Sequence, residues 1–185
     1  MGYSSAVPTP KPQLQLLFSR EQISERVAAL GAVISRDFAG QHVILIGVLK
    51  GAAIFMSDLA RALTIDASFD FVGAASYGKG SKSSGEVRLT KDLDRSVSGE
   101  NVILVEDILD TGLTLSFLRR MLLLHEPRAL RIATLLDKPS HRVEPFTANY
   151  VGFTIDDRFV VGYGLDHNEQ YRNLPDICVL DPLPE

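Results

Sequence analysis

The stretch Val102-Ile103-Leu104-Val105-Glu106-Asp107-Ile108-Leu109-Asp110-Thr111-Gly112-Leu113-Thr114-Leu115 carries the strongest structural signal in the chain. Four β-favouring apolar residues run directly into two adjacent carboxylates, and a short loop that contains Asp, Thr and Gly follows. Apolar residues then recur at helical spacing, which predicts a buried strand, a tight loop and the start of a helix in succession. In open α/β sheets, ligands bind just beyond the carboxyl ends of the strands, so we expect a binding site here.

The loop after this strand has the composition of a phosphate site. A helix N-terminus presents free N–H groups and the positive end of the helix dipole to an anion. Gly112 allows close backbone approach, and the hydroxyl groups of Thr111 and Thr114 add donors. Glu106 and Asp107 are expected to face ribose hydroxyl groups, a hard cation such as Mg²⁺ or a developing positive charge. The alternative is a capped strand-to-helix turn with solvated acids.

Other segments repeat this pattern of strands and helices. The run 43–48 is continuously apolar, which is typical of a strand buried on both faces of a parallel sheet. Further strands are expected at 69–75 and 131–136, and a helix at about 52–63. An earlier helix is expected to begin near Ser19, which has a glutamine three residues later as in a capping box. The pattern predicts an α/β domain with a mostly parallel central sheet flanked by helices.

Composition limits the classes of protein that this chain can represent. Its 185 residues include 23 acidic and 19 basic residues, which give a formal net charge of −4, and one cysteine. One cysteine excludes an intrachain disulfide and favours a reducing, cytoplasmic setting. The mild acidity argues against a nucleic-acid partner, and no run approaches the roughly 20 apolar residues of a membrane span. We expect a disordered tail at 1–14 and a single domain at 15–185.

The segment 76–90 is polar and rich in glycine and serine. A loop of this length inside a compact domain is usually a functional lid or is disordered, and we favour a flexible lid.

The motif at 106–112 resembles the phosphoribosyl-pyrophosphate signature of type I phosphoribosyltransferases, in the form typical of their hypoxanthine–guanine branch. The resemblance extends over about residues 17–180, because four more motifs follow the family's order and spacing: Leu49-Lys50-Gly51, Ser76-Tyr77, Leu136-Asp137-Lys138 and Phe159-Val160-Val161-Gly162-Tyr163-Gly164-Leu165-Asp166. It implies the type I phosphoribosyltransferase fold, with a core at about 38–137 and a small hood subdomain built from the N-terminal segment and the C-terminal residues.

The resemblance implies a purine-salvage reaction. The 5-phosphoribosyl group of phosphoribosyl pyrophosphate would pass to a 6-oxopurine, hypoxanthine or guanine, giving IMP or GMP and pyrophosphate, with Mg²⁺ as cofactor. A xanthine-preferring enzyme is one alternative, and a non-catalytic, nucleotide-sensing regulator of the same fold is another. Asp110 is present, and no arginine-rich stretch occurs, which argues against the regulator. Relatives are dimers or tetramers, so a homo-oligomer is expected.

The resemblance also assigns roles at the ribose phosphate. The 5′-phosphate would be cradled by Asp110, Thr111, Gly112, Leu113 and Thr114, although some relatives carry a polar or basic residue in place of Leu113. Glu106 and Asp107 would lie beside the ribose and on the metal side. Asp110 would also accept the N7 proton as purine N9 attacks C1′, an assistance worth about 10²–10⁴ in rate. Bracing of the loop is the alternative role for Asp110.

By the same resemblance, pyrophosphate and its metal ion would be bound by residues from other parts of the chain. By resemblance, Leu49, Lys50 and Gly51 would form the pyrophosphate loop, whose first peptide bond is often cis in the family. Arg172 would also reach the pyrophosphate, and Asp166 would hold Mg²⁺. A solvated lysine, a surface arginine and an acid that braces a turn are the alternatives.

The purine would be bound by Lys138, Phe159 and Val160, with Asp166 beside it. Lys138 would donate to O6, and because a lysine has only donors, adenine would be a poor substrate. Phe159 would stack on the ring, with core packing as its alternative, and Val160 would offer backbone groups.

The remaining candidates have weaker signals. Ser76 and Tyr77 match the dipeptide of the family's lid, which closes over the reacting centre. Cys178 lies in an apolar run and is expected to be a buried, inert thiol. The four histidines show no metal-ligand spacing: His42, His125, His141 and His167.

Overall fold

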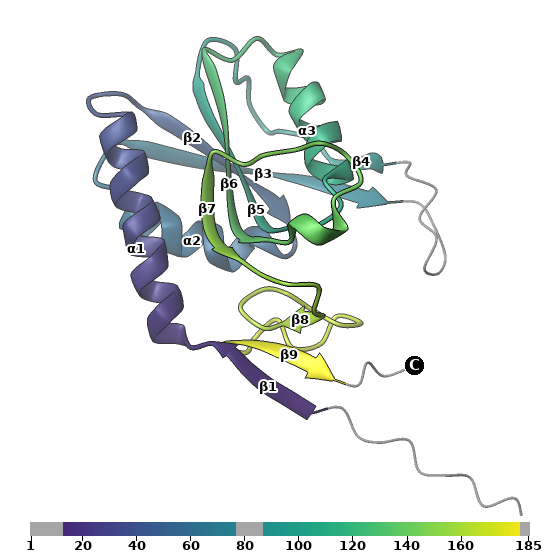
Figure 1. Ribbon diagram of the computed structural model, residues 1–185. Coiled ribbons are helices and arrows are strands. Elements are labelled where there is room, and N and C mark those ends of the chain that lie inside the picture. Colours follow the sequence, from purple (N-terminus) through teal and green to yellow (C-terminus); the bar gives the residue numbers. More distant parts are fainter. Residues whose placement is uncertain (1–12, 77–86, 182–185) are drawn as a thin grey trace, which may run out of the picture.

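The computed structural model describes residues 13–76 and 87–181 (Figure 1). The helices are α1 (Arg20–Asp37), α2 (Ala52–Ala62) and α3 (Leu113–Leu123), with a short 3₁₀ turn η1 (Pro139–His141). The strands are β1 (Gln13–Phe18), β2 (Val43–Leu49), β3 (Ala67–Ser76), β4 (Val87–Lys91), β5 (Asn101–Leu109), β6 (Ala129–Asp137), β7 (Tyr150–Thr154), β8 (Val160–Val161) and β9 (Ile177–Asp181).

A six-stranded sheet forms the core in the order β4-β3-β2-β5-β6-β7. Strands β3, β2, β5, β6 and β7 are parallel, and β4 pairs antiparallel with β3 at one edge. The chain moves from β2 to β3 on one side and later to β5 on the other, so the strand order reverses between β2 and β5. Ligands bind outside the carboxyl ends of the strands at such a reversal.

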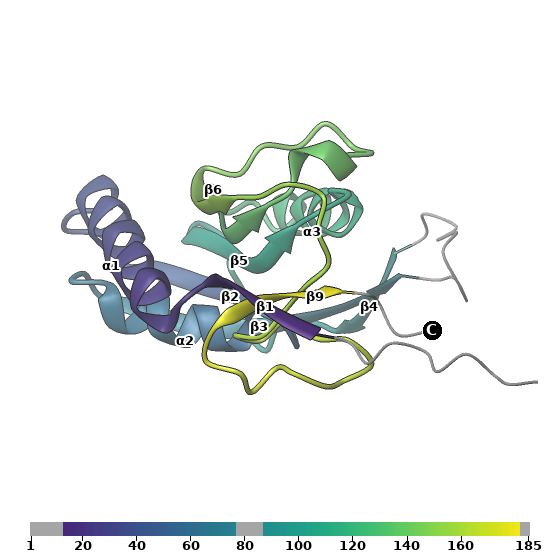
Figure 2. The same ribbon diagram turned by 60° about the horizontal axis from the view of Figure 1, so that its bottom comes forward.

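Helices cover both faces of this sheet, as the apolar runs predict (Figures 1 and 2). Alternate residues of a strand point to opposite faces. One set packs in a cluster with residues of α1 and α2, and the other packs with residues of α3. The first set includes Val43, Leu45, Ile103 and Val105, and the second includes Ile44, Ile46, Val102 and Leu104.

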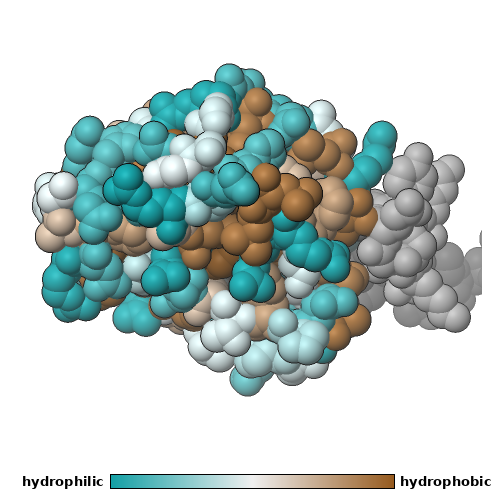
Figure 3. Space-filling model, turned by 90° about the horizontal axis from the view of Figure 1, so that it is seen from above, coloured by the Kyte–Doolittle hydropathy of each residue, from teal (hydrophilic) through white to brown (hydrophobic). Residues whose placement is uncertain are grey.

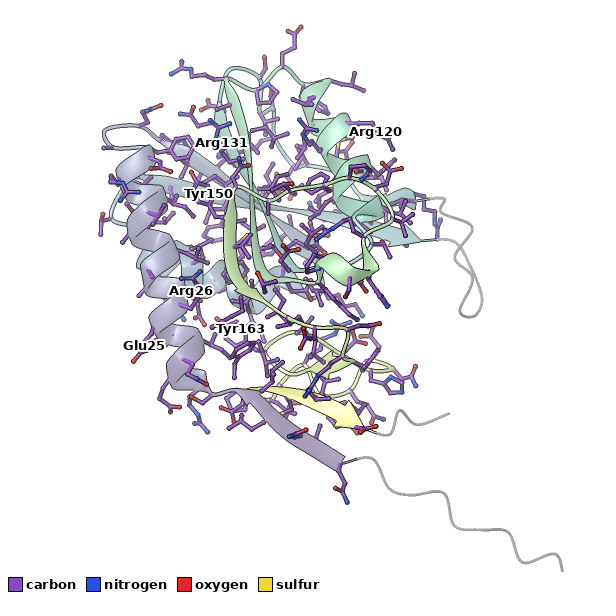
Figure 4. All side chains as sticks on the ribbon, viewed as in Figure 1. Glu25, Arg26, Arg120, Arg131, Tyr150 and Tyr163 are labelled. Carbon is purple, nitrogen blue, oxygen red and sulfur yellow. The ribbon has the colours of Figure 1, made fainter. Side chains whose placement is uncertain are left out.

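Helix α1 begins as the sequence predicts and is fixed to the far edge of the sheet. Ser19 is its N-cap in a complete capping box with Gln22. Arg26 donates to the backbone carbonyls of β7, and the hydroxyl group of Tyr150 donates to Asp37 at 3.0 Å (Figure 4). These contacts hold α1 against β7 of the core sheet, while the N–H of Arg20 at its start donates to Asp176 next to β9 of the hood at 2.8 Å.

The hood is a three-stranded antiparallel sheet in the order β1-β9-β8, so the two ends of the described chain lie side by side. It lies next to the carboxyl ends of the core strands (Figure 1). Tyr163 joins the hood to the core, because its hydroxyl group donates to Asp58 of α2 (Figure 4). The mostly parallel core sheet and the hood confirm the predicted type I phosphoribosyltransferase fold.

Three predicted boundaries are wrong. Gln13 and Leu14, expected in the tail, belong to β1 and pair with Asp181 and Leu180, a contact between the chain ends that local sequence does not reveal. The core extends past residue 137, because β7 joins the same sheet. Val87–Lys91, expected in the lid and the following turn, forms β4, whose inward and outward side chains alternate as in an edge strand. The rest of the expected lid, with Tyr77, lies outside the described residues.

The face remote from the hood is mostly hydrophilic around a smaller apolar area (Figure 3). No helix among the described residues has the length and apolar character needed to cross a membrane.

Candidate active site

The loops that follow β2, β5, β6 and β7 all leave the sheet at the edge next to the hood (Figures 1 and 2). This edge therefore collects the motifs that are scattered along the sequence.

The loop after β5 leads into a helix N-terminus whose geometry suits an anion. Gly112 is the N-cap of α3 with φ +84°, a left-handed conformation that favours glycine, and no side chain caps this helix. A small cavity of about 60 Å³ opens here. It is lined by Glu106, Ile108, Leu109, Asp110, Thr111, Gly112, Thr114 and Leu115. Leu113 is not among these residues, and its N–H lies 3.4 Å from the hydroxyl oxygen of Thr111.

A second cavity of about 210 Å³ adjoins the first. It is lined by Asp107, Ile108, Asp110, Lys138, Arg158, Phe159, Val160, Leu165 and Asp166. Every residue expected at the purine is therefore on one cavity wall. Phe159 is 38% exposed, which excludes core packing, and its ring meets His167 edge-on at 5.4 Å between centroids. Ile108 and Asp110 line both cavities, so one ligand can occupy both and pass Asp110.

Glu106 and Asp107 face different cavities, because neighbouring residues of a strand point to opposite sides. Burial raises the pKa of Glu106 well above its usual value, and the nearby Asp107 carboxylate adds to this increase. Burial also raises the pKa of Asp107 to about 6, against the opposing effect of its backbone hydrogen bonds. Acids with raised pKa values in a cleft are typical of functional sites.

Two carboxylate oxygens at this junction lack hydrogen-bond partners. They are Oε2 of Glu106 and Oδ1 of Asp110, both buried. Unpaired buried oxygens cost free energy, so native structures rarely keep them unless a ligand completes the site. This finding disfavours the capped turn with solvated acids.

The loop after β2 approaches the segment around Asp166 from the hood side. Its Leu49–Lys50 peptide bond is cis, as the resemblance implies. Lys50 Nζ lies 2.9 Å from Glu169 Oε2, and Arg172 Nη2 lies 3.2 Å from the other oxygen of Glu169. Arg172 also lies 2.8 Å from Asp166 Oδ1. The structure thus gathers both predicted pyrophosphate-binding cations around one carboxylate, Glu169, which the sequence analysis did not predict.

Gly51 is required by close packing against Asp107. A Cβ atom on Gly51 would lie 1.8 Å from Asp107 Oδ2. Gly164 has φ +101°, and a Cβ atom there would lie 2.2 Å from the carbonyl oxygen of Gly51. The two glycines therefore let the loop after β2 lie directly on the acid and on the hood.

Lys138 is 6% exposed and directly follows the end of β6, beside an acid that the sequence analysis missed. Its Nζ lies 2.9 Å from Asp157 Oδ1, and this hydrogen bond lowers the pKa of Asp157. His141 lies near both Asp157 and Asp110. Asp157 lies just beyond the end of β7, so the strand-end rule applies to it, but its distance to Lys138 depends on the folded loops.

Other expectations have mixed outcomes. Ser76 ends β3 and pairs with Val87, and nothing described connects it to the two cavities. Cys178 is a free, buried cysteine whose pKa is raised by burial, as expected for an inert thiol. Among residues 13–76 and 87–181, no group of three or more His, Cys, Asp or Glu side chains has the arrangement of a metal site.

Comparisons with known proteins all find phosphoribosyltransferases. Residues 17–168 match the model of the phosphoribosyl transferase domain. A hypoxanthine-guanine phosphoribosyltransferase of Mycobacterium avium is 51% identical over 173 residues, which cover 90% of this chain and 85% of that protein. The enzyme of the same name from Bacillus subtilis is 46% identical over 91% of this chain and 93% of its own. A crystal structure of a hypoxanthine-guanine phosphoribosyltransferase from Bacillus anthracis has a TM-score of 0.85 and 46% identity, covering 92% of this chain and 99% of that chain.

Proposed function

The chain belongs to the phosphoribosyltransferase family, and from this premise we propose how its residues divide the work of the reaction. The enzyme transfers the 5-phosphoribosyl group from phosphoribosyl pyrophosphate to hypoxanthine or guanine, giving IMP or GMP and pyrophosphate in purine salvage. One observation carries the assignment of roles: two cavities meet at Asp110, one beside the N-terminus of α3 and the other beside Lys138 and Phe159.

The smaller cavity takes the 5′-phosphate. Backbone N–H groups at the start of α3 and the hydroxyl groups of Thr111 and Thr114 donate to its oxygens. Leu113 contributes backbone only, since its side chain is not on the cavity wall. Glu106 and Asp107 accept hydrogen bonds from the ribose hydroxyl groups, which satisfies the unpaired oxygen of Glu106.

The larger cavity takes the purine. Phe159 stacks on the ring, Val160 offers backbone groups, and Lys138 donates to O6. Asp157, whose Oδ1 lies 2.9 Å from Lys138 Nζ, holds the amine at the place where O6 would lie. An amino group at position 6 has no lone pair to offer Lys138, so adenine is rejected.

The chemical step joins the two cavities. Purine N9 attacks C1′, the bond between C1′ and the pyrophosphate oxygen breaks, and the N7 proton passes to the carboxylate of Asp110, which lines both cavities. Lys50 and Arg172 leave Glu169 and bind the departing pyrophosphate, because pyrophosphate carries more negative charge than the Glu169 carboxylate.

Mg²⁺ fits this site as an ion carried by the substrate. Mg²⁺ is usually held by one or two carboxylates together with substrate phosphates, so a cage of three acids is not required. Asp166 and Asp107 on the wall of the larger cavity, with Glu106 nearby, supply such carboxylates. When bound, the ion offsets the charge of the pyrophosphate and helps it leave. Excess chelator should abolish product formation and added Mg²⁺ should restore it; full activity in chelator would exclude the metal.

Asp110→Asn tests the assignment of the proton acceptor. We expect turnover to fall by about 10²–10⁴ while IMP still binds, because the amide keeps the shape of the loop but cannot take the proton. Asp66→Asn, an exposed carboxylate at the opposite edge of the sheet, is the matched control. Near-normal turnover of Asp110→Asn would exclude Asp110 as the proton acceptor and would favour its alternative role, bracing of the loop.

The setting of the enzyme is part of the same proposal. A cytoplasmic location accords with the free, buried Cys178. A homo-oligomer accords with Phe69, whose side chain is 62% exposed next to a cavity of about 270 Å³ lined in part by Met56 and Phe71. Light scattering on the purified protein should give a dimer or a tetramer, and a monomeric mass would refute the assembly.

A further inference from the structure

A chain of polar side chains connects Asp110 to Lys138, two residues on the wall of the purine cavity. His141 Nδ1 lies 3.2 Å from Asp110 Oδ1, and His141 Nε2 lies 2.7 Å from Asp157 Oδ2. The other oxygen of Asp157 lies 2.9 Å from Lys138 Nζ. One imidazole ring therefore stands between the proposed proton acceptor and the acid that holds the proposed O6 donor.

We propose that His141 is a positioning residue that sets the spacing between Asp110 and Lys138 through Asp157. This inference rests on the roles proposed above. N7 and O6 lie on the same edge of a 6-oxopurine, so the two groups that meet them must be held at one separation. A single ring with a nitrogen toward each carboxylate does this directly.

The backbone fixes His141 relative to Asp110 before any ligand binds. His141 ends the turn η1, which begins with Pro139 directly after Lys138. Lys138 N–H donates to the carbonyl of Leu109 at 2.9 Å, on the strand that leads to Asp110. On the other side of η1, the N–H groups of residues 143 and 144 both donate to the carbonyl of Thr111, at 2.9 and 3.1 Å. The turn is therefore hydrogen-bonded to the end of β5 on one side and to the phosphate loop on the other.

The contact leaves Asp110 available for chemistry. Asp110 Oδ1 makes no well-aligned hydrogen bond even though His141 Nδ1 is 3.2 Å away. The imidazole lies beside the buried Oδ1, while the Asp110 side chain as a whole is 40% exposed, so the rest of the carboxylate can still meet N7. Two carboxylates face His141: Asp110 on the loop after β5 and Asp157 on the loop after β7. Lys138 lies on the other side of Asp157.

His141 contributes little to folding stability by this geometry. The side chains of His141, Asp110 and Asp157 are 45%, 40% and 54% exposed, and exposed ion pairs contribute little to stability. A bound purine and a closed site would exclude water and strengthen the same contacts. The effect of His141 therefore belongs to catalysis and to base binding.

The test compares His141→Ala and His141→Gln with His125→Ala, an exposed histidine after the end of α3. We expect His141→Ala to lower kcat with hypoxanthine by about 10- to 100-fold, the scale of a misplaced catalytic group, and to raise the KM for the base. The KM for phosphoribosyl pyrophosphate and the Tm should stay at wild-type values. His141→Gln should recover part of kcat, because an amide can contact both carboxylates, and His125→Ala should match the wild type.

A double-mutant cycle separates coupling from independent effects. Asp157→Asn combined with His141→Ala should lose less than the product of the two single losses, because both changes break the same chain of contacts. The inference would be overturned if the loss in the double mutant equalled the product of the two single losses. It would also be overturned if His141→Ala had wild-type kinetics, or if it raised both KM values equally and lowered the Tm. If wild-type protein made no IMP, or if Asp110→Asn stayed active, the proposed function or its roles would fail instead.

Discussion

Gly51→Ala sets two elementary effects against each other. Gly51 has helical dihedral angles, φ −58° and ψ −45°, immediately before α2, so alanine fits the backbone and would favour the helix. The added Cβ atom, however, would lie 1.8 Å from Oδ2 and 2.6 Å from Cγ of Asp107. Asp107 is 8% exposed and its Oδ1 accepts the N–H of Ile108 at 3.0 Å, so the carboxylate cannot move away without losing a contact.

The contact predicts a substantial loss of stability. Overpacking of this kind costs about 1–3 kcal/mol. In a protein of this size each kcal/mol shifts Tm by about 2–4 °C, so a cost of about 2 kcal/mol lowers Tm by roughly 4–8 °C. Turnover should fall as well, since Asp107 lines the purine cavity and would be displaced.

Thermal denaturation of four proteins measures this effect. Gly51→Ala should lower Tm in the wild-type background and should have little effect in an Asp107→Ala background, where the clashing atoms are gone. An unchanged Tm in the first comparison, or an equal loss in both, would show that the contact between Gly51 and Asp107 does not restrict this position.

Two further predictions concern selectivity and pH. Lys138→Ala should weaken the preference for hypoxanthine over adenine in initial-rate assays, because the donor to O6 is gone; unchanged selectivity would remove Lys138 from the base site. Burial alone would raise the pKa of Asp70, but N–H groups of Asp94 and Phe71 and the charge of Lys91 outweigh it and lower the pKa below 3.8. Stability from Asp70 is therefore present above the unfolded pKa and is lost as pH falls through the folded pKa. In urea denaturation, Asp70→Asn should be less stable than wild type at pH 7, and this difference should shrink as the pH falls below 3.8; a difference that stays constant as the pH falls would contradict the shift.

The sequence predicts those parts of the site that follow from local patterns. The motif at 106–114 places a strand, an acidic end and a helix N-terminus in succession, and the structure has all three. Lys138 was predicted at the ligand edge because it follows a buried strand, and the structure places it there. Phe159 was ambiguous, since an apolar residue before a strand can be core or ligand contact, and its exposure in the structure excludes the core.

Other parts depend on contacts between distant segments. Asp157 and His141 come close to each other and to the phosphate loop only when the loops after β6 and β7 fold together. Glu169 lies in a turn with φ +63°, and nothing in its neighbours signals that it holds two cations. The strand β1 depends on pairing with β9 at the other end of the chain, which leaves no local signature at Gln13.

The net charge of −4 is compatible with binding two phosphate-bearing groups because the charges are arranged locally. In the proposed site, Lys50, Arg172 and the start of α3 would supply the positive field, while Glu106, Asp107 and Asp110 line the two cavities. The overall acidity therefore reflects in part the chemistry at the sheet edge.

The central claim is that this site joins phosphoribosyl pyrophosphate to a 6-oxopurine. A product assay with purified protein, phosphoribosyl pyrophosphate, Mg²⁺ and hypoxanthine, guanine, xanthine or adenine in parallel tests it most directly. We expect IMP and GMP with release of pyrophosphate, and little or no AMP. Xanthine as the favoured base would contradict the assigned specificity, and no product from any base would contradict the claim that this chain is an enzyme.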